Sequence, residues 1–350
     1  MLKKFFGKFS KDIGIDLGTA NVLVYVKDQG IIINEPSVVA INTRNEKIIA
    51  VGDDAKVMLG KTPSHIVVTR PLVDGVISDF EVTEKMIKHF LDKVHRESFT
   101  FMPRPRVVVA IPLDVTEVER KAVEDAVIGA GASEVLLIEE PIAAAIGAGL
   151  PILQASGNMI VDIGGGTTEM AVISLGGVVS WKSLKLAGDK FNEAIVQYAR
   201  DKFNILLGDR TAEKIKIQVG SVLPMEETVE TTMRGRDLLT GLPKEVKITD
   251  ANIREAITKP IKLIVDSIKN TIENTPPELV SDLYEKGLVL TGGGALLNGI
   301  DILISQETKI PVSITDEPLT AVVRGTGKVL DDLDNLEDIL LPSTKNLGYN

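Results

Sequence analysis

The sequence predicts a mixed α/β protein made of two related lobes. Three observations predict this class: a glycine hairpin near the start of the chain, a second hairpin of the same pattern 146 positions later, and alternating strand and helix patterns between them. Strands that alternate with helices are typical of α/β architecture. A pattern that recurs at long spacing indicates internal duplication, with chance similarity of two hairpins as the alternative.

The hairpin of the second half is the stretch GNMIVDIGGGTTEMAVIS, residues 157–174. The run NMIVDI is typical of a buried strand, and the residues after Gly164, Gly165 and Gly166 alternate as in a second strand. Walker and dinucleotide-binding loops need a helix after their glycines, because the phosphate lies at the helix N-terminus. A strand follows here, so both loops are disfavoured, and we expect a hairpin tip rich in backbone N–H donors.

The hairpin of the first half is KDIGIDLGTANVLVYVKDQG, residues 11–30. In both copies an apolar strand reaches an aspartate, Asp16 or Asp162. An apolar residue, glycine, small residues and threonine follow, and then a β-branched strand. Two such copies, one at the start of each half of the chain, indicate internal duplication more strongly than one glycine cluster does.

A third glycine cluster, Gly292, Gly293 and Gly294, follows the predicted strand GLVL. The next residues have apolar side chains at helical spacing, so a helix is expected directly after the glycines. Those apolar residues are Leu296, Leu297, Ile300, Leu303 and Ile304. The cluster could let a flat ligand approach the backbone closely, or it could be a tight structural turn.

The chain between the hairpins supplies the strand VVVAIP, then a T-x-x-E capping box at Thr116 and Glu119. The helix that follows is predicted to have an apolar face. That face holds Val118, Ala122, Val123, Ala126 and Val127. After the strand EVLLIEE, Pro141 occupies a tolerated first-turn position of a small-residue helix.

Composition narrows the function classes. The 350 residues are 44% hydrophobic and 25% charged, which is ordinary for a globular protein long enough for two domains. The absence of cysteine excludes disulfides, thiolate catalysis and zinc–sulfur sites. A net charge of −10 argues against general nucleic-acid binding. No apolar run approaches the roughly 20 residues of a membrane span.

The first eleven residues, MLKKFFGKFSK, differ from this acidic average. Four apolar side chains at helical spacing and four lysines predict a short amphipathic helix on an anionic membrane surface. The apolar residues are Leu2, Phe5, Phe6 and Phe9. Alternatively, the phenylalanines dock on the protein's own core. One copy would bind weakly, so stable attachment would need a polymer.

These motifs together resemble the actin, sugar-kinase and heat-shock-chaperone ATPase superfamily, and within it the MreB family of bacterial actin homologues. GIDLGTAN resembles the first phosphate motif, VDIGGGTTE the second, and LTGGGALLNGID the adenosine motif. LLIEEPIAAAIGAG resembles the first connecting helix, and RPLVDGVISDFEVTEKMI and TAEKIKIQVGS are similar to family stretches. The resemblance covers residues 12 to 342.

The resemblance implies an actin-like ATPase fold of two duplicated ribonuclease-H-like lobes with a nucleotide cleft between them. Residues 12–145, completed by about 320–345, would form lobe I, with a small insertion at about 33–66. Residues 146–319 would form lobe II, with an insertion at about 183–245. Residues 1–11 would be the membrane-binding segment.

ATP and Mg²⁺ are the implied cofactors. Asp16 and Asp162 would hold hydrated Mg²⁺, because this ion keeps waters and takes few carboxylates. Glu140 would place the attacking water, with Glu139 as the ambiguous neighbour and Thr167 in the same water network; a helix-capping or salt-bridged Glu140 is the structural alternative. Phosphoryl transfer depends mainly on positioning and charge, so these groups suffice.

The remaining nucleotide contacts follow from the family motifs. They are Gly18, Thr19, Ala20 and Asn21 in the first loop, Gly164, Gly165, Gly166 and Thr167 in the second, Glu213, Lys216 and Ile217 on a helix, and Gly292, Gly293, Gly294 and Ala295 in the third. On spacing alone, Glu213 and Lys216 would be an ordinary surface pair.

The family also implies partners. A second membrane element is expected at Phe99, Phe101 and Met102, unless they pack under their own loop. Head-to-tail contacts would give polar protofilaments that pair antiparallel, and Val118 lies on the helix that matches this lateral contact. The protein would be cytoplasmic at the inner face of the cell membrane, directing rod shape with cell-wall synthesis proteins and without nucleic acid.

Two functions compete with the cytoskeletal ATPase. A small-molecule kinase of the same superfamily would need an acceptor site with a catalytic aspartate, and no such signature is present. A chaperone-type ATPase would need a substrate-binding domain beyond the ATPase core.

Overall fold

The computed structural model describes residues 12–97 and 104–342. The chain forms two compact units. Unit 1 comprises Met1–Ala155, Ile173–Val178 and Leu319–Asn350, and unit 2 comprises Ser156–Val172 and Val179–Pro318. The polypeptide therefore crosses between the units more than once, and each unit is described by itself.

Unit 1 is built on a five-stranded sheet of order β10-β9-β1-β2-β3. The strands are β1 (Ile13–Leu17), β2 (Asn21–Val26), β3 (Gly30–Pro36), β9 (Arg106–Ile111) and β10 (Glu134–Glu139). β1 and β2 form the first predicted hairpin, and β9 and β10 run parallel to β1. Short β-branched runs such as VVVAI suit strands that are buried on both faces.

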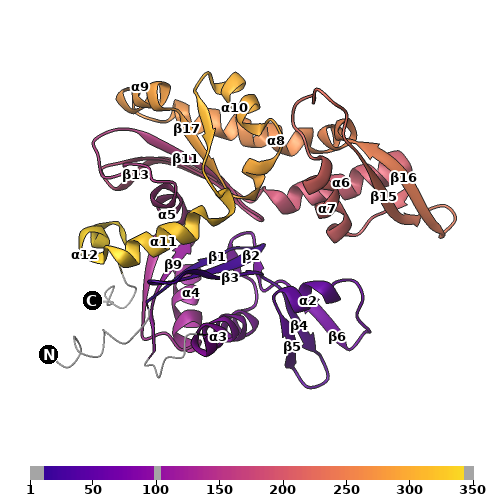
Figure 1. The fold of residues 1–350 in the computed structure, drawn as a ribbon, viewed down its shortest axis with the longest axis horizontal. Helices are drawn as coiled ribbons and strands as arrows, with labels where there is room; N and C mark the ends of the chain where they lie inside the picture. The colour runs from indigo at the N-terminus through magenta and orange to yellow at the C-terminus, as the bar shows by residue number, and fades with distance from the viewer. Residues whose placement is uncertain (1–11, 98–103, 343–350) are drawn as a thin grey trace. The chain divides into compact units, whose positions relative to one another are not determined.

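Helices cover both faces of this sheet (Figure 1). α3 (Phe80–Glu97) and α4 (Glu117–Gly129) lie against one face, and α5 (Glu140–Gly147) and α11 (Ala321–Asp331) lie against the other. α5 and α11 approach closely through glycines, since a Cβ on Gly325 would overlap the carbonyl oxygen of Ala143. α12 (Leu333–Leu336) and the 3₁₀ turns η2 (Pro318–Thr320) and η3 (Glu337–Ile339) flank α11.

A small layer follows β3 in unit 1. Its three-stranded sheet has the order β5-β4-β6. The elements are β4 (Val39–Asn42), β5 (Lys47–Val51), α2 (Asp53–Met58) and β6 (Ile66–Thr69), with the short pair β7 (Leu72–Val73) and β8 (Val76–Ile77) after them. This layer occupies much of the predicted insertion at about 33–66.

Unit 2 repeats the sheet of unit 1, with the order β13-β12-β11-β17-β18. The strands are β11 (Asn158–Ile163), β12 (Thr168–Ser174), β13 (Gly177–Leu184), β17 (Leu288–Thr291) and β18 (Val312–Ile314). β17 is parallel to β11, and β18 is parallel to β17. Strand for strand, this order matches the sheet of unit 1, so the predicted duplicated α/β class is confirmed. The predicted lobe boundaries stay a prediction.

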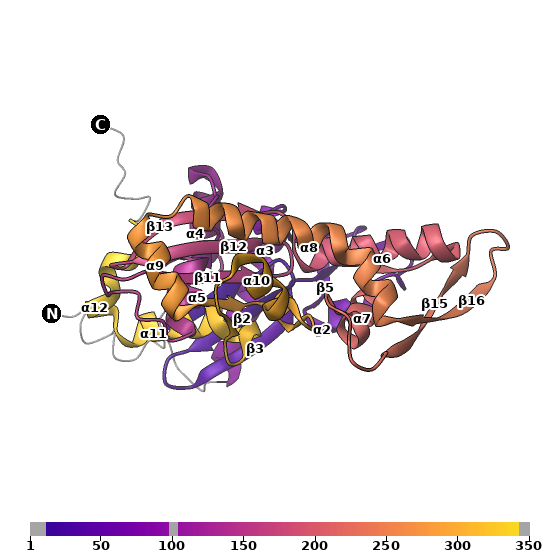
Figure 2. The same cartoon turned by 90° about the horizontal axis from the view of Figure 1, so that it is seen from above.

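The helices of unit 2 include the predicted long helix α8. Figure 2 shows α8 beside the sheet and extending to the outer hairpin, in agreement with its contacts to β13 and β16. The helices are α6 (Gly188–Phe203), α7 (Asp209–Val219), α8 (Asp250–Glu273), α9 (Pro277–Lys286) and α10 (Ile300–Thr308), with the 3₁₀ turn η1 (Gly293–Leu296). β14 (Ile205–Leu206), β15 (Glu230–Asp237) and β16 (Pro243–Thr249) form the outer sheet.

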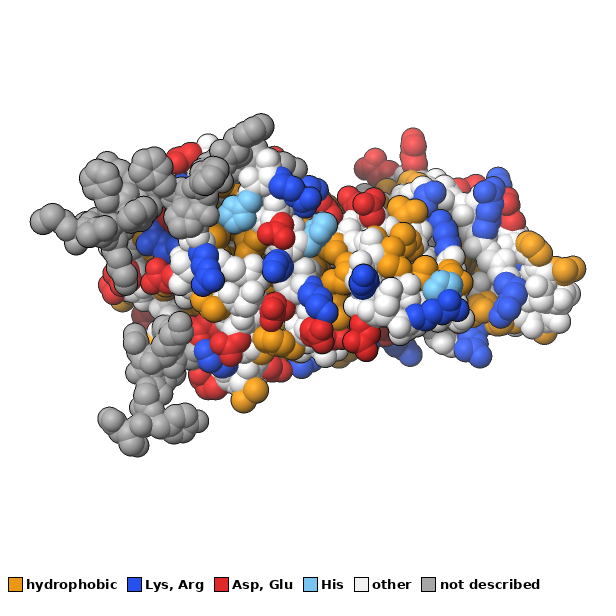
Figure 3. Space-filling view, turned by 90° about the horizontal axis from the view of Figure 1, so that it is seen from below, with side chains coloured by type: hydrophobic (Ala, Val, Ile, Leu, Met, Phe, Trp, Pro, Cys, Tyr) orange, Lys and Arg blue, Asp and Glu red, His pale blue; other side chains and the backbone are white. Residues whose placement is uncertain are grey.

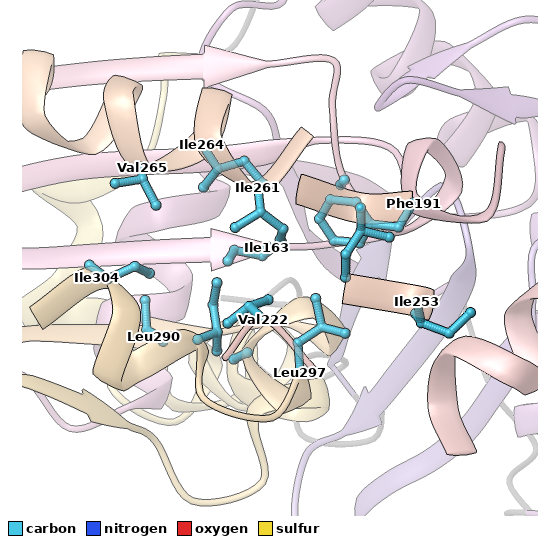
Figure 4. Packing of buried hydrophobic residues seen from close by; sticks show 14 of the residues in the cluster. Ile163, Phe191, Val222, Ile253, Ile261, Ile264, Val265, Leu290, Leu297 and Ile304 are labelled. Carbon is cyan, nitrogen blue, oxygen red and sulfur yellow. The ribbon is translucent and has the colours of Figure 1, made fainter. Parts of the chain in front are cut away.

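The core of unit 2 joins these helices to the sheet (Figure 4). Ile163 from β11, Phe191 from α6 and Ile261 from α8 are each at most 3% exposed and belong to one cluster. Burial of large aliphatic and aromatic side chains is the main stabilising contribution, at about 25 cal/mol per Å² of apolar surface. The cluster thereby anchors the ends of β11 and α6, where the second glycine loop lies.

Among the described helices, none combines the length and the apolar character that crossing a membrane would require.

Candidate functional site

The glycine loop of unit 1 is held by side chains. The buried Ser37, just after β3, donates its hydroxyl to the carbonyl of Gly18, and its backbone N–H bonds the carbonyl of Ala20 at 3.0 Å. The hydroxyl of Thr19 accepts from the N–H of Gly75 at 2.9 Å. Asn21 starts β2 and donates to Asn34 at 2.8 Å. These bonds fix the loop, and Ser37 supplies the hydrogen bonds to the carbonyls of Gly18 and Ala20.

Asp16 and Glu140 lie at the same edge of the unit 1 sheet. Asp16 pairs with Ala110, which pairs in turn with Ile138 on β10. Glu140 is two residues beyond Ile138, so the two acidic residues lie two strand spacings apart, about 10 Å across the sheet. The carboxyl ends of parallel strands are where ligands bind in open α/β sheets.

Glu140 begins α5 rather than ending the strand as the sequence suggested. β10 ends at Glu139, which is the N-cap residue of α5 without a side-chain capping bond. Glu140 is buried, at 9% exposure. Burial raises the pKa of Glu139 above its ordinary value, and the Arg120 charge opposes that rise.

The glycine loop of unit 2 is held by main chain instead. The N–H groups of Gly188 and Asp189, in the first turn of α6, bond the carbonyls of Gly164 and Gly165 at 3.2 and 2.8 Å. Within the loop, the N–H of Gly164 bonds the carbonyl of Thr167 at 2.9 Å. Gly166 completes the loop, and the side chain of Thr167 is buried.

Asp162 lies beside this loop at the end of β11. It is 8% exposed, and burial raises its pKa from 3.8 to about 6, with the neighbouring Thr291 hydroxyl partly offsetting the rise. Neither the Oδ1 atom of Asp162 nor the hydroxyl of Thr291 has a hydrogen bond of good geometry in the part of the chain that the structure describes. A buried carboxylate oxygen without such a bond is costly unless a cation or water reaches it.

The third glycine loop touches the same aspartate. Gly292 has φ of +79°, and a Cβ there would overlap Oδ1 of Asp162 and the carbonyl of Ile163. The predicted helix directly after the glycines is wrong: Gly293 starts only a 3₁₀ turn that holds Gly294 and the buried Ala295. The chain is extended at Leu297, and α10 begins only at Ile300. Helical spacing of apolar residues concealed this break, which the left-handed Gly299 permits.

Lys216 connects α7 to the second loop. Its Nζ donates to the carbonyl of Gly188 at 2.9 Å and lies 5.9 Å from the ring centre of Phe191. Glu213, one turn earlier on α7, is partly buried, whereas Ile217 is 75% exposed. Unit 2 therefore brings Asp162, the glycines of both its loops and Lys216 together at one end of its sheet.

Other predicted residues fall elsewhere. The four apolar residues of the N-terminal segment, and Phe99, Phe101 and Met102, lie outside the described residues. Val118 is 79% exposed in the first turn of α4 and does not share the burial of Val123 and Ala126 on the same helix, and its predicted lateral contact stays a prediction. Side chains tilt toward the helix N-terminus, and a first-turn side chain can therefore project past the surface that the helix covers.

Three residues escaped sequence reasoning. Ser37 and Gly188 hold the two loops, and Thr291 lies beside Asp162. The only sequence signal was position: Thr291 directly precedes a glycine cluster, and Gly188 begins a helix.

Comparison with known proteins decides the family. The family model described as "MreB/Mbl protein" matches residues 10–338. The chain belongs to the MreB/Mbl family. It is 54% identical to the cell shape-determining protein MreB of Escherichia coli K12, over 95% of this chain and 97% of that protein. It is 49% identical to the cell shape-determining protein Mbl of Bacillus subtilis, over 94% of this chain and 98% of that protein.

Solved MreB structures agree with the fold. MreB5 of Spiroplasma citri bound to ADP superposes with a TM-score of 0.89 at 39% identity, covering 94% of this chain and 99% of that one. The same protein bound to AMPPNP gives 0.88 at 38%, covering 94% and 98%. A MamK double helical filament gives 0.76 at 20%, covering 91% and 98%, which shows the fold alone. The predicted actin-like fold is confirmed.

Charges on the surface are mixed. On the face drawn in Figure 3, Lys and Arg side chains are interspersed with Asp and Glu. This distribution differs from the single basic patch that marks many nucleic-acid-binding proteins.

Proposed function

We propose that this chain is a cytoskeletal ATPase that binds ATP with Mg²⁺, polymerises into actin-like filaments on the inner face of the cell membrane, and directs rod cell shape by organising cell-wall synthesis. Its MreB and Mbl relatives are named cell shape-determining proteins. Identity of 49% or more over nearly the whole of both chains supports carrying that role over.

The observation that carries the proposal is the second glycine loop. Its carbonyls accept from the first N–H groups of α6, and Lys216 places a positive charge beside the start of that helix. We infer that the remaining N–H groups of the loop receive a ligand's phosphates. A relative 39% identical over 94% of this chain has been solved with ADP. Clustered N–H donors and a lysine are what a chain of phosphates requires.

Magnesium fits the carboxylates of these loops. The Oδ1 atom of Asp162 is buried without a hydrogen bond of good geometry in residues 12–97 and 104–342, which suits a metal-bound water. No cluster of three or more acidic or histidine side chains able to hold a metal occurs among the described residues. Mg²⁺ takes one or two carboxylates and keeps its waters when phosphates supply the rest. Asp162 would hold the hydrated ion in unit 2, which would neutralise phosphate charge, and Asp16 is the corresponding aspartate of unit 1.

Hydrolysis needs a group that orients water. Glu140 is fixed at the first turn of a helix that is buried throughout, so its carboxylate is positioned rather than mobile. We assign it to the attacking water, with the hydroxyl of Thr167 in the same network.

Replacement of Glu140 by Ala tests this assignment. We expect nucleotide affinity to stay within about threefold and turnover to fall about 100-fold or more, the usual range for a lost general base. Phosphate release and fluorescent-nucleotide titration measure the two quantities. Glu134→Ala, at the exposed opposite end of β10, is the matched control. Unchanged turnover in Glu140→Ala would remove the residue from its role.

Filament and membrane association are tested together by sedimentation. With ATP we expect polymer in the pellet, and with anionic lipid vesicles we expect co-sedimentation that falls when residues 1–11 are deleted. If the protein neither polymerises nor binds vesicles, yet phosphorylates a sugar, the kinase alternative replaces this proposal.

A further inference from the structure

Unit 1 contains a buried arginine that the proposed chemistry does not use. Arg120 on α4 is 8% exposed. Its Nη2 donates to the carbonyl of Pro342, and its Nη1 lies 3.8 Å from the carboxylate of Glu117. Its Nε is buried without a hydrogen-bond partner among the described residues. A guanidinium is costly to bury, so its surroundings must supply negative charge.

Glu139 is a second carboxyl group that feels the Arg120 charge. The side chain of Glu117 is 71% exposed and its contact with Arg120 is long, so solvent screens the pair. Glu139 is only partly exposed, and the Arg120 charge lowers its pKa against the rise that burial causes. The Arg120 charge therefore favours the ionised form of Glu139, although burial remains the larger influence on the pKa of this carboxyl.

Glu139 stands at a structural junction. It is the last residue of β10 and the N-cap of α5, where no side chain caps the helix. Glu140 is the next residue. The backbone direction at Glu139 thus sets where the carboxylate of Glu140 points.

The last described residues of the chain bond to β10 and to Arg120. The N–H of Leu341 bonds the carbonyl of Leu137 on β10 at 2.8 Å, as an antiparallel bridge. Pro342, the next residue, supplies the carbonyl that Arg120 holds. Contacts between residues more than 200 positions apart along the chain therefore restrain the last residues of β10 from two sides.

We propose that Arg120, together with Leu341–Pro342, forms a clamp that positions Glu140 for water attack, which makes Arg120 a positioning residue of the proposed ATPase. The inference rests on that proposed function. A misplacement of about 1 Å at a reacting group can cost up to 100-fold in rate, whereas the nucleotide's own contacts lie elsewhere. Loosening the clamp should therefore lower kcat and leave nucleotide affinity unchanged.

Three variants of the full-length protein test the clamp. Arg120→Ala should lower kcat about tenfold or more, with the affinity for ATP within about threefold of wild type. Leu341→Pro, which removes the N–H that bonds Leu137, should give the same separation of kcat from affinity. Arg120→Lys keeps the charge near Glu139 and should recover part of the rate, but it lacks the planar fork.

The pH profile adds a readout that loss of stability alone would not move. Burial raises the pKa of Glu139 and the Arg120 charge opposes that rise, so Arg120→Ala should raise this pKa further and shift the acidic limb of the kcat profile to higher pH. Val123→Ala, a buried residue of the same helix, is the control: it should lower the melting temperature with kcat and the profile unchanged.

The outcomes separate the two proposals. If wild type does not hydrolyse ATP, the proposed function fails. If wild type is active and Glu140→Ala is slow, but Arg120→Ala has wild-type kcat, the clamp fails. The clamp also fails if Arg120→Ala only loses stability, as Val123→Ala does, without a change in kcat or in the pH profile.

Discussion

The two glycine loops share a backbone pattern but are supported differently. In unit 1, the hydroxyl of Ser37 holds the carbonyl of Gly18. In unit 2, the first N–H groups of α6 hold the carbonyls of Gly164 and Gly165, and Lys216 fastens Gly188. Both loops follow an aspartate at the end of a central strand.

This difference shows how duplicated halves can diverge while keeping one geometry. Side-chain support can be removed by a single substitution that leaves the backbone unchanged. Main-chain support cannot be removed in that way. The loop of unit 1 should therefore be the more sensitive of the two to the loss of a single side chain.

The largest effect is expected from Gly292→Ala in the third glycine loop, which lies beside Asp162 in unit 2. The new Cβ would overlap Oδ1 of Asp162 at a positive φ that disfavours side chains. We expect a loss of about 2–4 kcal/mol in unfolding free energy and at least tenfold weaker nucleotide binding, measured by urea denaturation and titration. Gly241→Ala, at φ of +76° with open space around it, should cost strain alone, and equal losses in both variants would contradict the overlap.

The second-largest effect is expected from Ser37→Ala, which acts on the glycine loop of unit 1. It leaves the carbonyl of Gly18 without its hydroxyl donor, which costs about 1–3 kcal/mol for a buried group, and it should weaken nucleotide binding through loop 1 alone. Ser180→Ala is the matched control, because Ser180 is buried and donates to the carbonyl of Thr271 at 3.0 Å, away from either loop. It should lower stability similarly with unchanged affinity; a comparable affinity loss would mean that the Ser37 effect is global.

Lys216→Met should be milder. It removes the bond to Gly188 and the positive charge near the second loop but leaves the main-chain bonds of α6 intact. We expect nucleotide binding about fivefold weaker, equivalent to about 1 kcal/mol, with a small change in melting temperature. Lys214→Met, at an exposed position on the same helix, should bind normally. A loss above 100-fold would show that main-chain support is insufficient.

The smallest effect is expected in a third hairpin, β15–β16. We expect this hairpin to affect stability and not nucleotide binding. Its turn is closed by Asp237, which pairs with Lys244 and accepts from the N–H groups of Leu239 and Thr240. Lys244 first, then those N–H groups, lower the pKa of Asp237 to about 2.

The sign of the pH dependence follows from that shift. The unfolded pKa is about 3.9, so Asp237 stabilises the fold fully above about pH 4, and this contribution is lost as pH falls toward 2. Asp237→Asn should flatten that part of the stability curve, measured by urea denaturation from pH 5 to 2, and leave nucleotide affinity at pH 7 unchanged. An unaltered curve would contradict a native role for the ionised carboxylate.

Local patterns carried most of the fold prediction. Both hairpins, the capping box at Thr116 and the proline start of α5 depend on neighbours in sequence, so the chain alone reveals them. The start of α10 was missed because Leu296 and Leu297 have helical spacing but lie in a 3₁₀ turn and an extended residue.

The sequence predicted the site residues that stand in recognisable motifs, but not the long-range contacts between them. The aspartates and glycines stand in recognisable runs, whereas the contact between Gly292 and Asp162 joins residues 130 positions apart. The burial of Arg120 likewise depends on Pro342, more than 200 positions away. Contacts of that range come from tertiary packing and leave no mark on local spacing.

The division of the chain between the units has a consequence for biosynthesis. α11, which covers β1, β2, β9 and α5 in unit 1, is encoded after the whole of unit 2. A ribosome releases residues in order, and domains generally fold as they emerge. The first strands made must therefore wait for nearly the last helix, while unit 2 can complete its core. Until then the small-residue surface of α5 that receives α11 lies open, so nascent chains stalled before residue 321 should be the ones that chaperones bind.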